Sequence, residues 1–360
     1  MRFISPFLKR VVYPGLSRSG CLRRHTRDTP VVLTYHGLLP PGYKTFDPVL
    51  DGNLVTPQRF RQHLQFLAKH YHMISPEGFL RWINGDERLP ANSVLLTCDD
   101  GLRNNLTDML PILQEFRLTC LFFVTSTGLN GNPAMSWCDE FLLMLLAGPS
   151  VIRLHWPDMN INLDGEGVRE KAQSSWELVK HVSRFDESKR DSVKERLRDH
   201  LGLSKDWNAK YHDDPVLSRR FLTMADRELR ELAASGMTIG AHTSHHPLLP
   251  RLSEELAWNE ICENREHLQQ ILGQQIWAFA YPFGNCEAVT SREIKMAKNA
   301  GFTCAFINED RGSVSKNRYS MPRIHVTAEM TMAELEAHLS GFHRSMRRAL
   351  MPAPEIATAS

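Results

Sequence analysis

The stretch Ser93-Val-Leu-Leu-Thr-Cys-Asp-Asp-Gly101 decides the fold of this 360-residue chain. An apolar run that ends in turn residues predicts a buried strand, and two adjacent acids directly after it are costly unless they have a function. Parallel α/β folds gather functional side chains at such strand ends. Neighbours on an extended chain point to opposite sides, so Asp99 and Asp100 reach one site only where the chain begins to turn. Taken alone, the pair is also typical of a plain turn in which an Asp caps a helix.

Strands and helices alternate on both sides of this stretch. Val31–Tyr35 is β-branched and aromatic, which predicts a buried strand that ends at His36. Thr56 and Pro57 are a favoured N-cap and first residue, so a helix is predicted to begin there. Further strands are predicted at residues 120–124, 237–240, 276–281, 301–307 and 321–326, and further helices at 110–116, 253–272 and 332–344. This order predicts an α/β fold built on parallel strands.

The pattern changes between about residues 150 and 220. Val151–Trp156 alternates like a half-exposed strand, residues 166–200 are charged and helical in pattern, and residues 206–218 are polar and irregular. We interpret 150–220 as a mainly helical insertion. The predicted organisation is a basic N-terminal segment at 1–29, one large domain at 30–345 that contains the insertion, and a flexible tail at 346–360.

Composition excludes several classes of protein. The formal net charge of +2 gives no reason to expect a nucleic-acid partner. The seven cysteines are odd in number and form no CxxC pair, which argues against a disulfide framework or a thiolate zinc site. They are interpreted as small buried hydrophobes in a reducing compartment. No stretch approaches the roughly 20 apolar residues of a membrane span.

The first 29 residues are basic, and their apolar pieces are too short for a signal-peptide core. We therefore expect a cytoplasmic protein. The segment either packs on the domain or lies on an anionic membrane surface, and the sequence leaves both alternatives open. The second alternative predicts peripheral contact with the inner membrane face.

A second polar cluster, His242-Thr-Ser-His-His-Pro247, follows the strand predicted at 237–240. His242 and His246 share a face if this segment coils into a helical turn. Imidazole is the commonest metal ligand, and two imidazoles with one carboxylate leave a position open for water or substrate. Alone, the pair is also typical of a solvated loop or of two structural histidines.

A third cluster, Tyr281-Pro-Phe-Gly284, ends another predicted strand and could aim a backbone N–H into a cavity. On its own it is equally typical of an ordinary turn. Together, the three clusters supply a two-histidine, one-carboxylate metal centre beside a spare carboxylate. Metal-assisted hydrolysis needs these parts: a Lewis acid, a base and an oxyanion site.

At this point the chain resembles a known family. Thr97-Cys-Asp-Asp-Gly101 is similar to the TFDDG motif of the polysaccharide deacetylases (NodB-homology, carbohydrate esterase 4), and His242–Pro247 is similar to their H-S/T-x-x-H-P motif. Tyr281–Gly284 resembles the end of their third motif. Leu33-Thr-Tyr-His-Gly37 and the helix at Thr56 resemble the start of the exopolysaccharide-synthesis subgroup. The resemblance covers about residues 30–145 and 220–345.

The resemblance implies a distorted (β/α) barrel of the NodB-homology type, here with a mainly helical insertion. It implies a divalent metal, usually zinc, held by Asp100, His242 and His246. Asp99 would be the general base that deprotonates the attacking water, and the backbone N–H of Phe283 would help to stabilise the oxyanion. The implied products are acetate and a free sugar amine.

Three departures from the family pattern affect the expected site. Cys98 replaces the usual Phe, which is a packing change. Ala280 stands where many members carry an Arg that orients the base, and Arg323 could supply this guanidinium from the last strand. The family's leucine-x-histidine motif, which provides the general acid, is not plainly present. His325 is the candidate by position, and His36 is its rival.

Tyr281 and His36 are further expected to lie just outside the reacting groups. The expected partner is a carbohydrate, either an N-acetylated glycan or a lipid-linked precursor of one. A small amide or cyclic imide is the alternative substrate for the same centre. A third alternative, a non-catalytic glycan-binding protein on a decayed fold, predicts lost ligands, whereas the three ligands and the base are present here.

Overall fold

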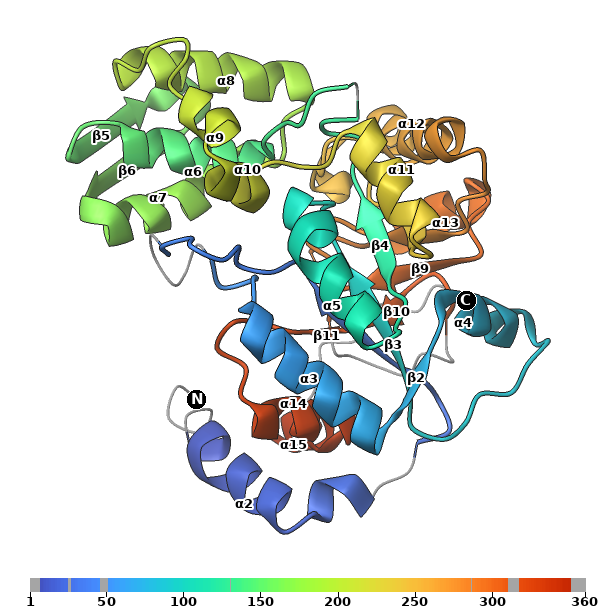
Figure 1. The fold of residues 1–360 in the computed structure, drawn as a ribbon. Coiled ribbons are helices and arrows are strands. Elements are labelled where there is room, and N and C mark those ends of the chain that lie inside the picture. The colour runs from blue at the N-terminus through green and yellow to red at the C-terminus, as the bar shows by residue number, and fades with distance from the viewer. Residues whose placement is uncertain are drawn as a thin grey trace.

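The computed structural model describes residues 7–24, 27–45, 51–129, 131–285, 287–309 and 317–350. Its centre is a nearly closed barrel of eight parallel strands surrounded by helices (Figure 1). The order around the barrel is β10 (Met321–Pro322), β9 (Cys304–Ile307), β8 (Ala278–Ala280), β7 (Thr238–Ala241), β4 (Leu121–Val124), β3 (Ser93–Cys98), β1 (Val31–Tyr35) and β11 (Ile324–His325). A short further strand, β2 (His72–Ile74), pairs with the start of β3. The predicted distorted (β/α) barrel is confirmed.

The last predicted strand is split in two, and this split closes the barrel. Met321 and Pro322 pair with β9, whereas Ile324 and His325 pair with β1, so Arg323 lies at the point where the chain changes partner. Pro322 has no N–H with which to continue the ladder. The prediction of one continuous strand over 321–326 was therefore wrong, and the break places the Arg323 side chain at the seam of the barrel.

Helices cover the outside of the barrel through apolar stripes that the sequence predicts. In α3 (Pro57–His70), the Thr56 hydroxyl accepts a hydrogen bond from the Arg59 N–H at 3.1 Å, which confirms the predicted N-cap. Ser253 caps α12 (Glu254–Leu272) in the same way. The other helices against the barrel are α4 (Pro76–Asn84), α5 (Leu110–Glu115), which follows one π-helical turn (Asn105–Met109), α11 (Asp226–Ala234) and α13 (Ser291–Asn299).

Between β4 and β7 the chain leaves the barrel and builds a second layer, at the upper left of Figure 1. Its members are α6 (Trp137–Ala147), the antiparallel strands β5 (Val151–Trp156) and β6 (Ile161–Glu166), α7 (Gly167–Val182), α8 (Glu187–His200), α9 (Ala209–Asp213) and α10 (Pro215–Phe221). A hydrophobic core of its own, which includes Phe141, Trp156 and Leu178, holds this layer together. Because α6 contributes to that core, the layer begins before residue 150.

The prediction that residues 206–218 are irregular was wrong, because α9 and most of α10 lie there. A start signal for α10 is present in the sequence. The Asp214 side chain accepts hydrogen bonds from the N–H groups of Val216 and Leu217, and Pro215 is the first helical residue. Both helices are short, so their apolar pattern is weak.

The basic N-terminal segment packs on the protein. Its helical turns, Leu8–Val12, α2 (Tyr13–Arg18) and Cys21–Arg24, lie against α14 (Met332–Leu339) at the bottom of Figure 1. Ion pairs of 2.8 Å join Lys9 to Glu334 and Arg23 to Glu336. The predicted helix over 332–344 is interrupted at Gly341, whose φ is +81°, and α15 (Phe342–Leu350) follows it. The flexible tail predicted at 346–360 therefore starts inside this helix, and residues 351–360 lie outside the described ones.

The described helices include none that is long and apolar enough to cross a membrane. All six described cysteines are free thiols. Cys98, Cys120 and Cys304 are buried, as expected for small hydrophobes, whereas Cys138 and Cys262 are half-buried and Cys21 is exposed.

Candidate active site

Asp99 lies at the carboxyl end of β3 with its side chain inside the barrel. It is 2% exposed and forms a two-pronged ion pair with Arg323, whose Nη1 and Nη2 each lie 2.7 Å from one carboxylate oxygen. The guanidinium also lies over the rings of Phe123 and Phe306. Burial raises the pKa of Asp99, but the charge and hydrogen bonds of Arg323, together with the nearby His242 and His36, outweigh burial, so the net pKa is lowered. Asp99 is therefore an ionised carboxylate held in one orientation.

Asp100 turns away from the strand and reaches the same cavity. Its φ is +75° and that of Gly101 is +72°, so the chain bends sharply after β3. Asp tolerates the left-handed region better than most residues. The next position has no room for a side chain, because a Cβ on Gly101 would lie 2.7 Å from Val124 Cγ1. This turn explains how two adjacent acids face one site.

His242 is the first residue after β7, and its ring is held from behind. Its Nδ1 lies 2.7 Å from the carbonyl oxygen of Ala280, which makes Nδ1 the donor and leaves Nε2 free to bind a metal. Its backbone N–H donates to Asn264 Oδ1 at 2.9 Å, and Asn264 in turn donates to the Val124 carbonyl. Position 280, where many family members carry an Arg, thus acts here through its backbone.

His246 reaches the same point through a loop. The segment does not form the helical turn considered above, because Thr243 and His246 have φ values of +68° and +54°. The Thr243 hydroxyl accepts a hydrogen bond from the His246 N–H at 3.0 Å and stabilises this turn. The ring centroids of His242 and His246 are 4.9 Å apart.

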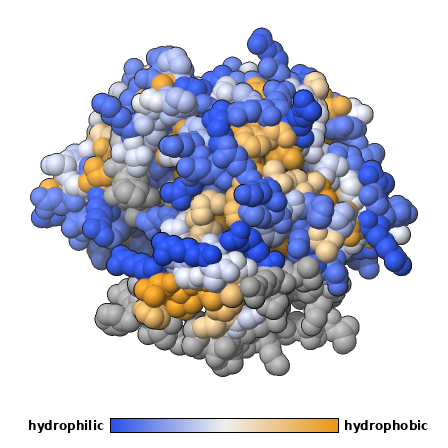
Figure 2. Space-filling model, turned by 60° about the horizontal axis from the view of Figure 1, so that its bottom comes forward, coloured by the Kyte–Doolittle hydropathy of each residue, from blue (hydrophilic) through white to orange (hydrophobic). Residues whose placement is uncertain are grey.

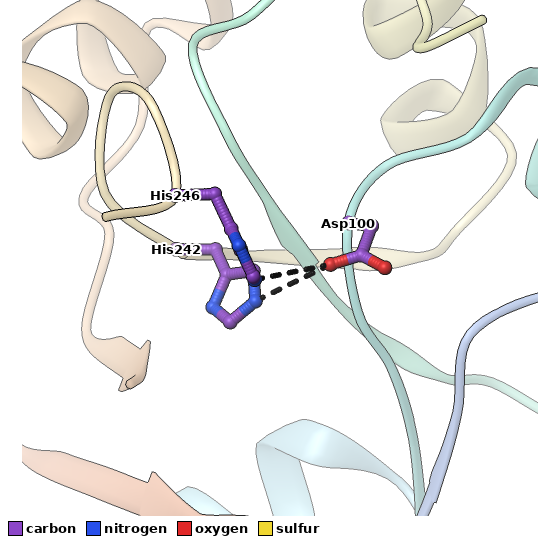
Figure 3. A group of neighbouring side chains, drawn as sticks. All are labelled: Asp100, His242 and His246. Atoms are coloured by element: carbon purple, nitrogen blue, oxygen red, sulfur yellow. Dashed lines mark ion pairs between the residues drawn. The ribbon is translucent and has the colours of Figure 1, made fainter. Parts of the chain in front are cut away.

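Asp100, His242 and His246 converge, and one donor atom from each lies within 4.8 Å of the other two (Figure 3). Asp100 Oδ1 lies 3.5 Å from His242 Nε2 and 3.6 Å from His246 Nε2. Bonds of about 2.0–2.1 Å to a tetrahedral zinc place its ligands about 3.4 Å apart. Two imidazole nitrogens and a carboxylate at this spacing therefore fit a divalent metal such as zinc.

The charges of this triad also suit a cation. Burial raises the pKa of Asp100, but its hydrogen bond with His242 and the nearby histidines reverse the shift, so the carboxylate is ionised. Burial lowers the pKa of His246 to about 4, which leaves that ring neutral. For His242, burial lowers the pKa, but Asp100, Asp99 and the hydrogen bond to the Ala280 carbonyl together outweigh burial and raise it. A metal would displace the His242 proton.

Phe283 and Tyr281 also line the cavity. Phe283 has a φ of +60°, and its ring centroid lies 4.9 Å from that of His246. Among the described residues, its N–H has no recorded acceptor. The Tyr281 hydroxyl points away from the triad and donates to the Tyr319 carbonyl at 2.9 Å, so this side chain supports the turn from the core.

His36 and His325 form a pair on the cavity wall, with ring centroids 4.7 Å apart. His36 Nδ1 and His325 Nε2 are buried and lack a hydrogen-bond partner among the described residues. Burial, with His36 and Arg323 adding to it, lowers the pKa of His325 to about 3. His325 is therefore a neutral imidazole in the resting protein and does not carry the proton that a general acid would donate.

One cavity of about 320 Å³ is lined by the triad, the base, the histidine pair and the aromatic turn: Asp99, Asp100, His242, His246, His36, His325, Tyr281 and Phe283. Arg323 is not part of this lining. The second layer also contributes to the wall, through Trp137, Asp139, Trp176 and Arg220. These four residues could not be selected from the sequence, because no local motif marks them. Asn264 was missed for the same reason.

Comparison with known proteins agrees with this geometry. Residues 203–305 match the family described as polysaccharide deacetylase, a range that contains the histidine pair and the Tyr281–Gly284 turn. A search of curated protein sequences found no match. The recognition of this family from the sequence motifs is thereby confirmed.

Three solved structures are similar in fold. The Streptococcus pyogenes deacetylase PplD in complex with acetate has a TM-score of 0.54 at 16% identity, over 87% of this chain and 98% of that one. IcaB from Ammonifex degensii has a TM-score of 0.52 at 19% identity, over 87% and 97%. A de-N-acetylase from Aggregatibacter actinomycetemcomitans has a TM-score of 0.51 at 16% identity, over 86% and 99%. At these identities the likeness shows the fold.

Proposed function

Because the chain has the polysaccharide deacetylase fold and matches that family, we propose that it is a hydrolase that removes N-acetyl groups from amino sugars of a polysaccharide or of its lipid-linked precursor. The observation that carries this proposal is the convergence of Asp100, His242 and His246 beside the ionised, Arg-paired Asp99. A binding protein has no need of a buried base next to a metal triad.

Asp100, His242 and His246 would hold the cation. When bound, a divalent metal such as zinc would act as a Lewis acid on water and on the acetamide carbonyl. Asp99, ionised by its pairing with Arg323, takes the proton of the attacking water. A C–O bond forms at the acetamide carbon, and the N–H of Phe283 donates to the oxyanion.

The C–N bond then breaks, and the leaving amine needs a proton. His325 and His36 present unpartnered buried nitrogens to the cavity. Since the pKa of His325 is about 3, its ring is neutral at rest and cannot bring a proton of its own. We assign to this pair the relay of a proton that the reaction itself releases. Acetate and the free sugar amine leave.

The direct test is acetate release from N-acetylglucosamine oligomers by the purified protein. Activity is expected to disappear with a chelator and to return with zinc, because the triad fits a cation. Acetate released only from small acetamides would favour the small-amide alternative. Activity that survives complete metal removal, shown by elemental analysis, would contradict the proposal.

Contact with a membrane is a second part of the proposal, and it rests on the outer face of the N-terminal segment. Phe7 and Val11 are 57% and 55% exposed, one helical turn apart, beside the exposed basic residues Lys9 and Arg10. Figure 2 looks onto this end of the molecule and shows an apolar patch at the lower left, with hydrophilic side chains along its upper edge. An apolar patch with basic neighbours suits an anionic bilayer, where a lipid-linked sugar would be met.

We expect the protein to bind vesicles that contain anionic lipid, and Val11→Glu to weaken this binding about tenfold. Co-sedimentation with vesicles measures the effect. Val151→Glu is the matched control, since Val151 is also exposed, at 43%, but belongs to the second layer. Equal loss in both variants, or no binding by the unmodified protein, would contradict the membrane proposal.

A further inference from the structure

Trp176, on α7, is an aromatic side chain in the open wall of the cavity. It is 40% exposed, whereas Trp137 and Trp156 of the same layer are 7% and 5% exposed. The described exposed large hydrophobic residues are Phe7, Val11, Val151, Val168, Trp176, Leu256 and Trp258. Of these, Trp176 alone lines the cavity that holds the triad. An indole left open to solvent at this place offers a flat apolar surface to a ligand.

Asp139 shares this wall, and its carboxylate is held in place. It lies in the first turn of α6, where its N–H donates to the Ser136 hydroxyl at 3.2 Å. Arg220 Nη1 lies 3.8 Å from Asp139, and Arg220 Nε lies 2.7 Å from Asp51. The Arg220 guanidinium thus forms ion pairs with two carboxylates. The side chain of Asp139 is still 23% exposed, and it lines the cavity. The Arg220–Asp51 pair also joins the second layer to the segment between β1 and α3, which contains Asp51.

A small side pocket of about 40 Å³ opens between these two residues and the layer behind them. Cys138, Leu142, Ser175 and Val179 complete its lining. This volume exceeds that of a single water and suits a methyl or hydroxymethyl group. The wall therefore combines an aromatic face, a carboxyl group that can accept hydrogen bonds and a recess.

We propose that this wall is a sugar subsite of the proposed deacetylase, in which Trp176 covers the apolar face of the pyranose next to the acetylated one and Asp139 accepts hydrogen bonds from its hydroxyl groups. A pyranose ring has C–H groups on its faces and hydroxyl groups at its edge, which match an indole face and a carboxylate. The expected ligand is a neutral N-acetylhexosamine chain of at least two sugars. The subsite rests on the proposed function, because the triad sets where the acetylated sugar lies.

The test compares N-acetylglucosamine with its pentamer on zinc-loaded protein. If the pentamer is hydrolysed, KM and kcat are measured; if it is not, Kd is measured by titration calorimetry on the same protein. Trp176→Ala is expected to raise KM or Kd for the pentamer about tenfold and to leave the monomer value and kcat unchanged. Trp176→Phe should retain most of the affinity for the pentamer, and Asp139→Asn should weaken pentamer binding several-fold.

Trp258→Ala is the matched control, since Trp258 on α12 is 36% exposed and does not line the cavity. If the pentamer binds in a Trp176-dependent way but no acetate is released, the result supports the subsite and contradicts the proposed function. If acetate is released but Trp176→Ala and Asp139→Asn leave KM for both pentamer and monomer unchanged, the subsite is wrong and the proposed function stands. A pentamer that does not bind at all would also overturn the subsite.

Discussion

Asp99→Asn is expected to lower kcat by about a thousandfold while one zinc ion stays bound to each chain. Asp99 is placed as the base and Asp100 as the ligand, although they are neighbours in sequence. The amide of Asn cannot take a proton, but it keeps the shape of the carboxylate and one oxygen for Arg323. The loss should therefore appear in the rate and not in metal content.

Asp100→Asn is the matched control, because it changes the adjacent residue in the same way. It is expected to lose zinc as well as activity, since Asp100 Oδ1 faces both histidines. Elemental analysis and acetate release on the same samples separate the two outcomes. If Asp99→Asn loses zinc and Asp100→Asn keeps it, Asp99 is the metal ligand and Asp100 is the base.

The pH dependence of the rate tests the proton relay. Because the pKa of His325 is about 3, no basic limb is expected near the ordinary histidine pKa of about 6.5. His325→Ala should lower kcat without moving the profile along the pH axis. A basic limb in the unmodified protein that disappears in His325→Ala would show instead a protonated acid in the resting enzyme.

How far the sequence predicts this molecule depends on how local each signal is. Asp99, Asp100, His242 and His246 stand in short segments after buried strands, and the parallel fold brings such ends together. Arg323 was selected through the family resemblance, as the residue that could replace the Arg missing at position 280. In each case a few neighbouring residues contain the information.

Trp176, Asp139 and Arg220 have no such signal. They meet the cavity only because a second layer folds back over the barrel, through contacts between residues far apart in sequence. The helical turn considered for His242–His246 was wrong for a related reason. The spacing of four also fits a loop with two left-handed residues, and hydrogen bonds to Thr243 and Asn264 select that loop.

The second large effect is expected for Arg323→Ala. Its guanidinium is fully buried and paired through both nitrogens with Asp99. Removing one partner of a buried pair leaves an unpaired charge, so the free energy of unfolding should fall by about 3–5 kcal/mol. The released carboxylate is also free to rotate, and kcat should fall about a hundredfold. Arg323→Lys keeps the charge but not the two-pronged geometry, and an intermediate loss is expected.

The stability loss should depend on pH, and the sign follows from Asp99. With Arg323 present, the lowered pKa of Asp99 stabilises the fold above the unfolded value of about 3.9, and this contribution is lost as pH falls through the folded pKa. Without Arg323, burial is opposed only by His242 and His36, so we expect that pKa to rise above the unfolded value and the variant to lose stability as pH rises. The gap between the two proteins should therefore be larger at about pH 8 than at about pH 5.

Urea unfolding with a chelator present measures this gap, since a bound ion would otherwise add to the stability of both proteins. Arg318→Ala, at an exposed arginine three residues before the barrel segment that contains Arg323, is the control and should show no such pH dependence. A gap that stays constant with pH would mean that Arg323 stabilises the barrel seam by packing on Phe123 and Phe306 and not through the charge of Asp99. If the difference in the free energy of unfolding grows with pH and the rate is also lost, the ion pair between Arg323 and the ionised Asp99 both stabilises the barrel seam and orients the base.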